Sequence, residues 1–155
     1  MAADARYRLV YEESIRAVDD QQTALDELRS RTGILLSAAS ISTSFFGGLS
    51  LKARDIGPFG WFAMAAFVGL ALCVCVILFS TRWTFQADVD ELLTDYVEGD
   101  PPADLTEIHR SLSFYRQRLF DENAVRLGHL LLSFRIATSL LVLEVVAWLV
   151  NFVRS

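Results

Sequence analysis

TGILLSAASISTSFFGGLSL, from Thr32 to Leu51, is a run of twenty residues without a charged side chain. A helix of about 20 consecutive apolar residues can cross the hydrocarbon core of a bilayer. Seven of the twenty residues carry a hydroxyl, which a membrane helix tolerates when the hydroxyl bonds the carbonyl one turn back. The stretch therefore predicts a membrane span that is rich in Ser and Thr.

Two more charge-poor stretches follow it. Residues 56–81 carry no charge, and residues 127–153 carry only Arg135 and Glu144, whereas most other charges gather in residues 1–31 and 82–126. This block pattern is typical of a multi-span membrane protein with water-exposed helices. We expect an all-α integral membrane protein with three transmembrane helices and long cytoplasmic helical extensions, assembled as a homo-oligomeric bundle.

Four segments are predicted along the chain. They are a cytoplasmic amphipathic helix (1–31), a transmembrane hairpin (32–81, with spans at about 32–51 and 59–81), a cytoplasmic helical segment with a break at 99–104 (82–126), and a third transmembrane helix (127–155). The first 31 residues have no apolar core of the kind that a cleavable signal peptide needs, so we expect the first span to remain as an anchor.

The charged segments read as helices. Apolar positions in the first segment recur at steps of four and three, with one polar gap, at Tyr11, Ile15, Val18, Gln22 and Leu25. No proline separates this stripe from the first span, so one continuous helix is expected. Residues 84–98 are predicted to extend the second span, and a helix from about 105 to 152 is predicted after the prolines of "GDPPAD". At 1.5 Å per residue that last helix would be roughly 70 Å long.

The balance of Lys and Arg predicts the orientation. The N-terminal segment and the 82–126 segment carry five each, whereas the hairpin loop carries two and the C-terminal tail one. Positive residues concentrate on the cytoplasmic side of inner-membrane proteins. We therefore expect a multi-pass membrane protein with a cytoplasmic N-terminus, its hairpin loop and C-terminus lying outside.

Small residues form one seam along the first span. They recur at steps of four and three and are Gly33, Ser37, Ser40, Ser44 and Gly47; this set is the small-residue seam below. Such a seam lets helix backbones approach closely, and serines can bond across the contact. One interpretation is an intrachain packing face, and the other is the wall of a water-filled path in an oligomer. The second span shows only a short small-residue row at Ala65, Gly69 and Cys73.

Glu144 lies near the middle of the third predicted span. An acid at that depth costs roughly 2.5–3.5 kcal/mol on insertion scales, so it marks a functional site by default. The alternative is a structural role, in which Glu144 bonds hydroxyls of the first span and holds the bundle together. Arg135 lies nearer the boundary and can extend its head group to the interface.

Four arginines in the charged part before the third span, Arg110, Arg116, Arg118 and Arg126, form a candidate binding surface. One interpretation is a site for an anionic ligand such as a nucleotide, an oligonucleotide or a lipid head group. The other is a solvated face whose arginines pair with nearby acids.

No catalytic or metal-binding pattern stands out. His109 and His129 have no Cys or carboxylate cluster at metal-ligand spacing, and no glycine-rich phosphate loop follows a strand. Cys73 and Cys75 are two residues apart, so they point to different sides of a helix and are expected to be free. We expect no enzyme activity, no metal and no cofactor.

The layout resembles a known group of proteins. A helix with "LDELRSRTGILLSAAS" runs into a small-residue span, and a long helix with "SFYRQRLFDENAVRLGHLLLSFRIATSLLVLEVVAW" enters the last span. This resembles the small membrane effectors of bacterial anti-phage systems, of the SLATT and Pycsar types. The resemblance implies an oligomer that breaches the inner membrane when a nucleotide-sensing partner signals infection.

We therefore expect an oligomeric membrane-permeabilising or channel-forming effector, controlled by a nucleotide-type signal or a signalling partner protein. Its partners would be membrane lipid and further copies of itself. The alternative is a non-conducting membrane scaffold that docks a cytoplasmic protein through residues 84–126.

Overall fold

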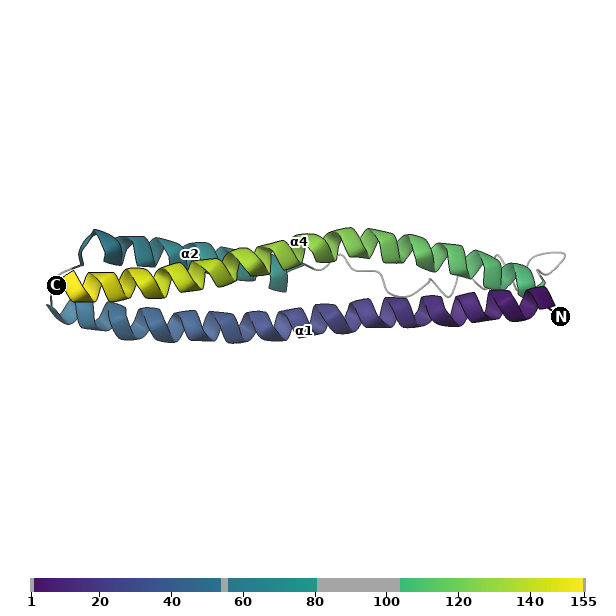
Figure 1. Cartoon of the computed structure of the whole chain (residues 1–155), viewed down its shortest axis with the longest axis horizontal. Helices are drawn as coiled ribbons and strands as arrows, with labels where there is room; N and C mark the ends of the chain where they lie inside the picture. The colour runs from purple at the N-terminus through teal and green to yellow at the C-terminus, as the bar shows by residue number, and fades with distance from the viewer. Residues whose placement is uncertain (1, 54–55, 81–103, 155) are drawn as a thin grey trace. The chain divides into compact units, whose positions relative to one another are not determined.

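The structure, a computed structural model, describes residues 2–53, 56–80 and 104–154 and is built from helices (Figure 1). These are α1 (Ala2–Ala53), α2 (Pro58–Leu78) and α4 (Leu105–Arg154). No strand occurs within the described ranges. The all-α prediction is confirmed for them, whereas the predicted helix 84–98 and most of the break at 99–104 lie outside the described residues.

Each of the three helices contains a stretch long and apolar enough to cross a membrane. α1 has 52 residues and joins the predicted amphipathic helix to the first span without a break, as the absence of proline predicted. α4 has 50 residues and likewise joins a charged part to an apolar part. Since a span needs about 20 residues, both helices are more than long enough to carry a span and a charged helix together.

Buried positions in α1 and α4 recur every seven residues. In α1 they are Val18, Leu25, Thr32 and Ala39, and in α4 they are Asn123, Leu130, Ala137, Glu144 and Asn151. A seven-residue period is the spacing of coiled-coil packing, in which 3.5 residues make one turn. The α1 stripe includes Gln21, which is 7% exposed, whereas the predicted Gln22 is exposed.

The chain divides into two compact units. Unit 1 comprises Met1–Leu25 and Arg82–Leu127, and unit 2 comprises Asp26–Thr81 and Gly128–Ser155. In unit 1, the ring of Tyr11 stacks on His109 with centroids 5.4 Å apart, and the Gln21 amide donates to the Phe120 carbonyl at 3.0 Å. Because both contacts join residues 98 or 99 positions apart, α1 and α4 run parallel in this unit.

In unit 2, α2 runs antiparallel to α1 and α4 (Figure 1). At one end Asn151 donates to the Ser50 hydroxyl (3.4 Å) and accepts from the Gly60 amide (3.2 Å). At the other end Arg29 donates to the Ser80 carbonyl at 2.9 Å. The contacts of Asn151 thus connect all three helices at one end, and the contact of Arg29 connects α1 to a residue just after α2 at the other.

The core of unit 2 combines small and branched side chains. One cluster contains Ala39, Leu70, Val74 and Ala137, and a second contains Ala63, Ala147 and Trp148. Small residues let membrane helices approach closely, which is the main source of packing energy where no water is displaced. The buried residues of α2 include Ala66, Leu70, Val74 and Ile77. Of the predicted row, Cys73 packs against the first cluster and a Cβ added to Gly69 would lie 3.3 Å from Leu140, whereas Ala65 is exposed. Both cysteines are free, as predicted.

Candidate functional site

The apolar half of α1 presents three different faces. Thr32 and Ala39 are fully buried and belong to the face that packs inside unit 2. Ile34, Ile41 and Phe45 are 68%, 70% and 62% exposed and form a bulky apolar face suited to lipid. The small-residue seam lies between these two faces along the helix.

Most of the small-residue seam is left uncovered in unit 2. Gly33, Ser37 and Ser44 are exposed and Ser40 is half-buried. A Cβ added to Gly33 would meet nothing within 4 Å, whereas one added to Gly47 would lie 3.7 Å from the Trp148 ring. The structure thus brings Gly47 against α4 and leaves the other four positions away from the packed face.

Two of the three seam hydroxyls donate within α1. Ser37 donates to the Gly33 carbonyl at 2.9 Å, and Ser40 donates to the Leu36 carbonyl at 2.8 Å. These bonds satisfy the donors, and each hydroxyl oxygen still has lone pairs with which it can accept from water or another chain. The seam is therefore narrow and mildly polar, and it can accept hydrogen bonds.

Glu144 lies inside unit 2 and is fully buried. Thr43 of α1 donates to Glu144 Oε1 at 2.5 Å, and Oε2 is buried with no hydrogen-bond partner among the described residues. The structure therefore places Glu144 against the packed side of α1 and not beside the exposed Ser37 and Ser44. This contact links α1 to α4 across the middle of the apolar region.

A groove of about 420 Å³ lies at the end of the seam in unit 2. It is lined by Thr43, Ser44, Gly47, Gly48, Leu51, Ile56, Met64 and Trp148. The indole of Trp148 is 1% exposed, and its Nε1 is buried without a hydrogen-bond partner within the described ranges. The groove thus extends the seam toward α4.

A second groove, which sequence reasoning missed, lies in unit 1 and has a volume of about 460 Å³. We call it the N-terminal groove. Its α1 wall consists of Tyr7, Val10, Glu13, Ser14 and Ala17, and its α4 wall consists of Arg110, Ser113, Phe114 and Gln117. The sequence signal that could have revealed it is the presence of the apolar residues Val10 and Phe114 within charged segments. In the structure these two side chains are 54% and 68% exposed.

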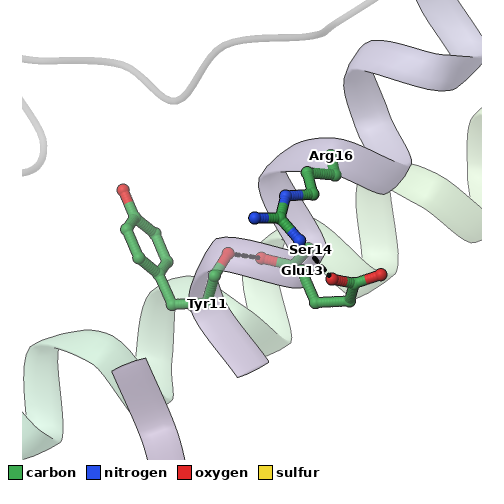
Figure 2. A network of polar contacts seen from close by, with 4 residues as sticks. All are labelled: Tyr11, Glu13, Ser14 and Arg16. Carbon is green, nitrogen blue, oxygen red and sulfur yellow. Dashed lines mark hydrogen bonds and ion pairs between the residues drawn. The ribbon is translucent and has the colours of Figure 1, made fainter. Parts of the chain in front are cut away.

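Two local polar contacts lie within α1 along this groove. Figure 2 shows Arg16 donating to the Glu13 carboxylate (3.2 Å) and the Ser14 hydroxyl donating to the Tyr11 carbonyl (2.7 Å). Ser113 on the opposite wall donates to the His109 carbonyl at 2.7 Å. Both serine donors are therefore satisfied by their own helices, and the space between the walls is mainly apolar.

The four predicted arginines do not gather on one face. At about 100° per residue, their positions point in four different directions around α4. Arg110 lines the N-terminal groove, the Arg116 guanidinium lies 5.5 Å from the centroid of the Tyr11 ring, and Arg118 pairs with Glu122 at 3.1 Å. Arg126 is exposed near the end of unit 1. The geometry thus separates the four side chains rather than collecting them around one anion.

No group of three His, Cys, Asp or Glu side chains is arranged to hold a metal ion among the described residues. His109 stacks on Tyr11, and His129 is exposed on α4.

Comparison with known proteins adds no relative. No protein-family model matches the sequence, and neither a curated protein nor a solved structure matches the chain.

Proposed function

We propose that this protein is an oligomeric membrane-permeabilising or channel-forming effector. Its activity would be exerted on the membrane itself and not on a chemical substrate. The observation that carries the proposal is the exposure of Gly33, Ser37 and Ser44 in the apolar half of α1. A lipid-facing helix gains little from small and hydroxylated residues, whereas a helix facing water or another helix gains from both.

Conduction by this chain would require several copies. Three helices whose shared core is filled by Ala39, Leu70 and Ala137 leave no central channel within one copy. Closed assemblies of identical chains are most often cyclic. Copies that turn the small-residue seam toward one another would place the serine oxygens along one path and leave Ile34, Ile41 and Phe45 for lipid.

The cellular setting of the proposal follows the layout and charge pattern. The protein would reside in the bacterial inner membrane with its N-terminus in the cytoplasm and would act in anti-phage defence by abortive infection. A nucleotide-type ligand or a signalling partner protein would control it. Because Arg110, Arg116, Arg118 and Arg126 do not converge in the chain, a ligand bound by all four would have to lie between copies.

Ion or dye release from liposomes tests the proposal. Ser37→Leu with Ser44→Leu fills the seam with bulk, so we expect release to fall at least tenfold. Ala38→Leu is the matched control, because Ala38 is exposed on the same helix outside the seam; this variant should retain release within about twofold. Equal release by the seam variant and the control would remove the seam from the conduction path.

The alternative is a non-conducting scaffold that docks a cytoplasmic protein. Leu105 and Val125 favour it, since they are 56% and 62% exposed on the charged part of α4. Wild-type protein that releases no ions or dye, with or without extract from phage-infected cells, would favour the scaffold over the pore.

A further inference from the structure

We propose that the N-terminal groove is the surface through which two copies of this chain meet. The two copies would be related by a two-fold axis parallel to α1 and α4 of unit 1. This inference rests on the proposed function in one respect, namely that the active form contains several copies. It adds which surface they share and which charges pair across it.

The two walls of the groove carry opposite charges at the same height. Glu13 lies on the α1 wall and Arg110 on the α4 wall. The contacts Tyr11–His109 and Gln21–Phe120 set the register of the two helices at 98 to 99 residues. Residue 13 is therefore level with residues 111 to 112, one to two residues from Arg110, which is an axial offset of about 1.5–3 Å at 1.5 Å per residue.

Both charges are available to a second chain. Arg110 forms no ion pair with any residue that the structure describes and is exposed. Glu13 pairs with Arg16, and the two side chains are 71% and 72% exposed. An ion pair this exposed contributes little to stability, so Glu13 can exchange or share its partner at little cost.

A parallel two-fold axis makes this groove complementary to itself. Two copies inserted into one membrane in the same orientation have α1 entering the membrane from the same side. Rotation about an axis parallel to the helices keeps every residue at its height and places the α1 wall of each copy against the α4 wall of the other. Glu13 of each copy then faces Arg110 of the second copy, and the symmetry forms the ion pair twice.

The apolar side chains of the groove also fit this arrangement. Phe114 on the α4 wall is 68% exposed. The same register puts it level with residues 15 to 16, between the small residues Ser14 and Ala17 on the α1 wall. The second copy would therefore receive the Phe114 ring in the space above its own Ser14 and Ala17, which removes two large apolar surfaces from water.

These features favour a second copy over an unrelated protein. A foreign helix could bind an apolar groove with any distribution of rim charges. A second copy presents the same two walls, so it can bind only if each acid lies at the height of a base and each large side chain lies at the height of small ones. The groove meets both conditions.

Cysteine cross-linking between differently tagged copies tests the contact directly. In a background with Cys73→Ala and Cys75→Ala, one chain would carry Glu13→Cys and the other Arg110→Cys. After reconstitution together and mild oxidation, we expect a disulfide-linked heterodimer as the main product, at least fivefold above either homodimer. The matched control joins Asp19→Cys to Arg118→Cys, which lie at similar heights and are exposed outside the groove, and should give little product.

Charge reversal provides an independent measurement. Glu13→Arg or Arg110→Glu alone should raise the dimer dissociation constant in detergent roughly tenfold, since like charges then face each other twice. The two reversals combined in one chain should restore it to within about twofold. Helix content by circular dichroism would verify that each variant is folded.

Three results would overturn the contact: no heterodimer above the control pair, predominance of the Glu13→Cys homodimer, or a double reversal as weak as the singles. A specific product with another protein in place of the heterodimer would assign the groove to that protein. Ion release tests the pore proposal independently of this contact. A cross-linked heterodimer without ion release would support the contact and contradict the pore.

Discussion

Glu144 is the clearest case in which a single residue has two interpretations. Its central position in an apolar stretch marks it as functional by default. The structure places it fully buried against Thr43, with the hydroxyl of Thr43 donating to its carboxyl group. A polar link between two helices in an apolar medium stabilises their packing, by about 1 kcal/mol on average. From this contact we expect Glu144 to have a structural role in joining α1 to α4.

Two substitutions separate the structural role from a functional one. Glu144→Ala removes the acceptor and leaves the half-buried Thr43 hydroxyl without this partner, so we expect a loss of about 1–3 kcal/mol in the free energy of unfolding. Glu144→Gln keeps an acceptor oxygen and should lose less than half as much. Equilibrium unfolding in mixed micelles, followed by circular dichroism, measures both.

Val142→Ala provides the control for this pair, since Val142 is 58% exposed on the same helix and its truncation should change stability little. A Glu144→Ala variant as stable as wild type would contradict the structural role. A Glu144→Gln variant with full stability but altered ion release would instead return the residue to the conduction path.

Gln21 shows what sequence could not decide at the residue scale. A helical stripe that contains Val18 and Leu25 can include either Gln21 or Gln22 between them, because the steps are three and four residues in either order. Both residues are glutamine, so their side chains do not distinguish the two positions. The structure selects Gln21 because its amide reaches the Phe120 carbonyl, a partner 99 residues away. The periodicity predicted the stripe and its polar gap, but the position of the gap depends on tertiary contact.

At the scale of the helix, α2 has one packed side within a uniformly apolar sequence. Leu70 is fully buried and Leu72 is 63% exposed, although they lie two residues apart. Leu70→Ala should lower the free energy of unfolding by about 1–3 kcal/mol, because it leaves a cavity against Ala39 and Ala137. The cost is below that in a water-soluble core, since lipid also solvates a leucine.

Leu72→Ala is the matched control for this prediction, and it should change stability by less than about 0.5 kcal/mol, as substitutions away from packed features do. The same unfolding measurement in micelles compares the two variants. If both truncations cost the same, the assigned packing side of α2 is wrong.

The helices themselves were predictable, and the packing side of α2 was not. In α1, charges alternate with apolar positions, so composition and periodicity together predict both the helix and most of its buried stripe, and in α4 they predict the helix. In α2, no polar residue distinguishes one side from another. The predicted row found the packed side only in part, because Gly69 and Cys73 lie at its edge and Ala65 is exposed. Which row of α2 packs is determined by the side chains of the neighbouring helices.

At the scale of the whole molecule, one sequence feature organises the chain, namely the alternation of charged and apolar blocks. Charge-free stretches cover residues 32–51 and 56–81, whereas residues 1–31 hold five arginines and seven acids. The small-residue seam was recognisable from spacing alone. The exposure of the seam and the presence of the N-terminal groove depend on which sides of α1 and α4 are covered by other helices. The spacing of residues within one helix does not determine this.

The same blocks predict the orientation of the chain in the membrane. α1 runs unbroken from Ala2 to Ala53, so Asp19 and Lys52 lie at opposite ends of its apolar stretch. Because ten Lys and Arg flank the predicted inner ends of the spans and three flank the outer ends, Asp19 should be cytoplasmic and Lys52 outside.

Labelling of intact spheroplasts with a membrane-impermeant maleimide measures this orientation. In a background with Cys73→Ala and Cys75→Ala, Lys52→Cys should react within minutes, and Asp19→Cys only after the membrane is permeabilised. Arg118→Cys, on α4, should behave like Asp19→Cys if both charged segments share the cytoplasmic side. The reverse labelling pattern would place the N-terminal groove outside the cell, where no cytoplasmic nucleotide or signalling protein could reach it, and would remove that form of control from the proposed function.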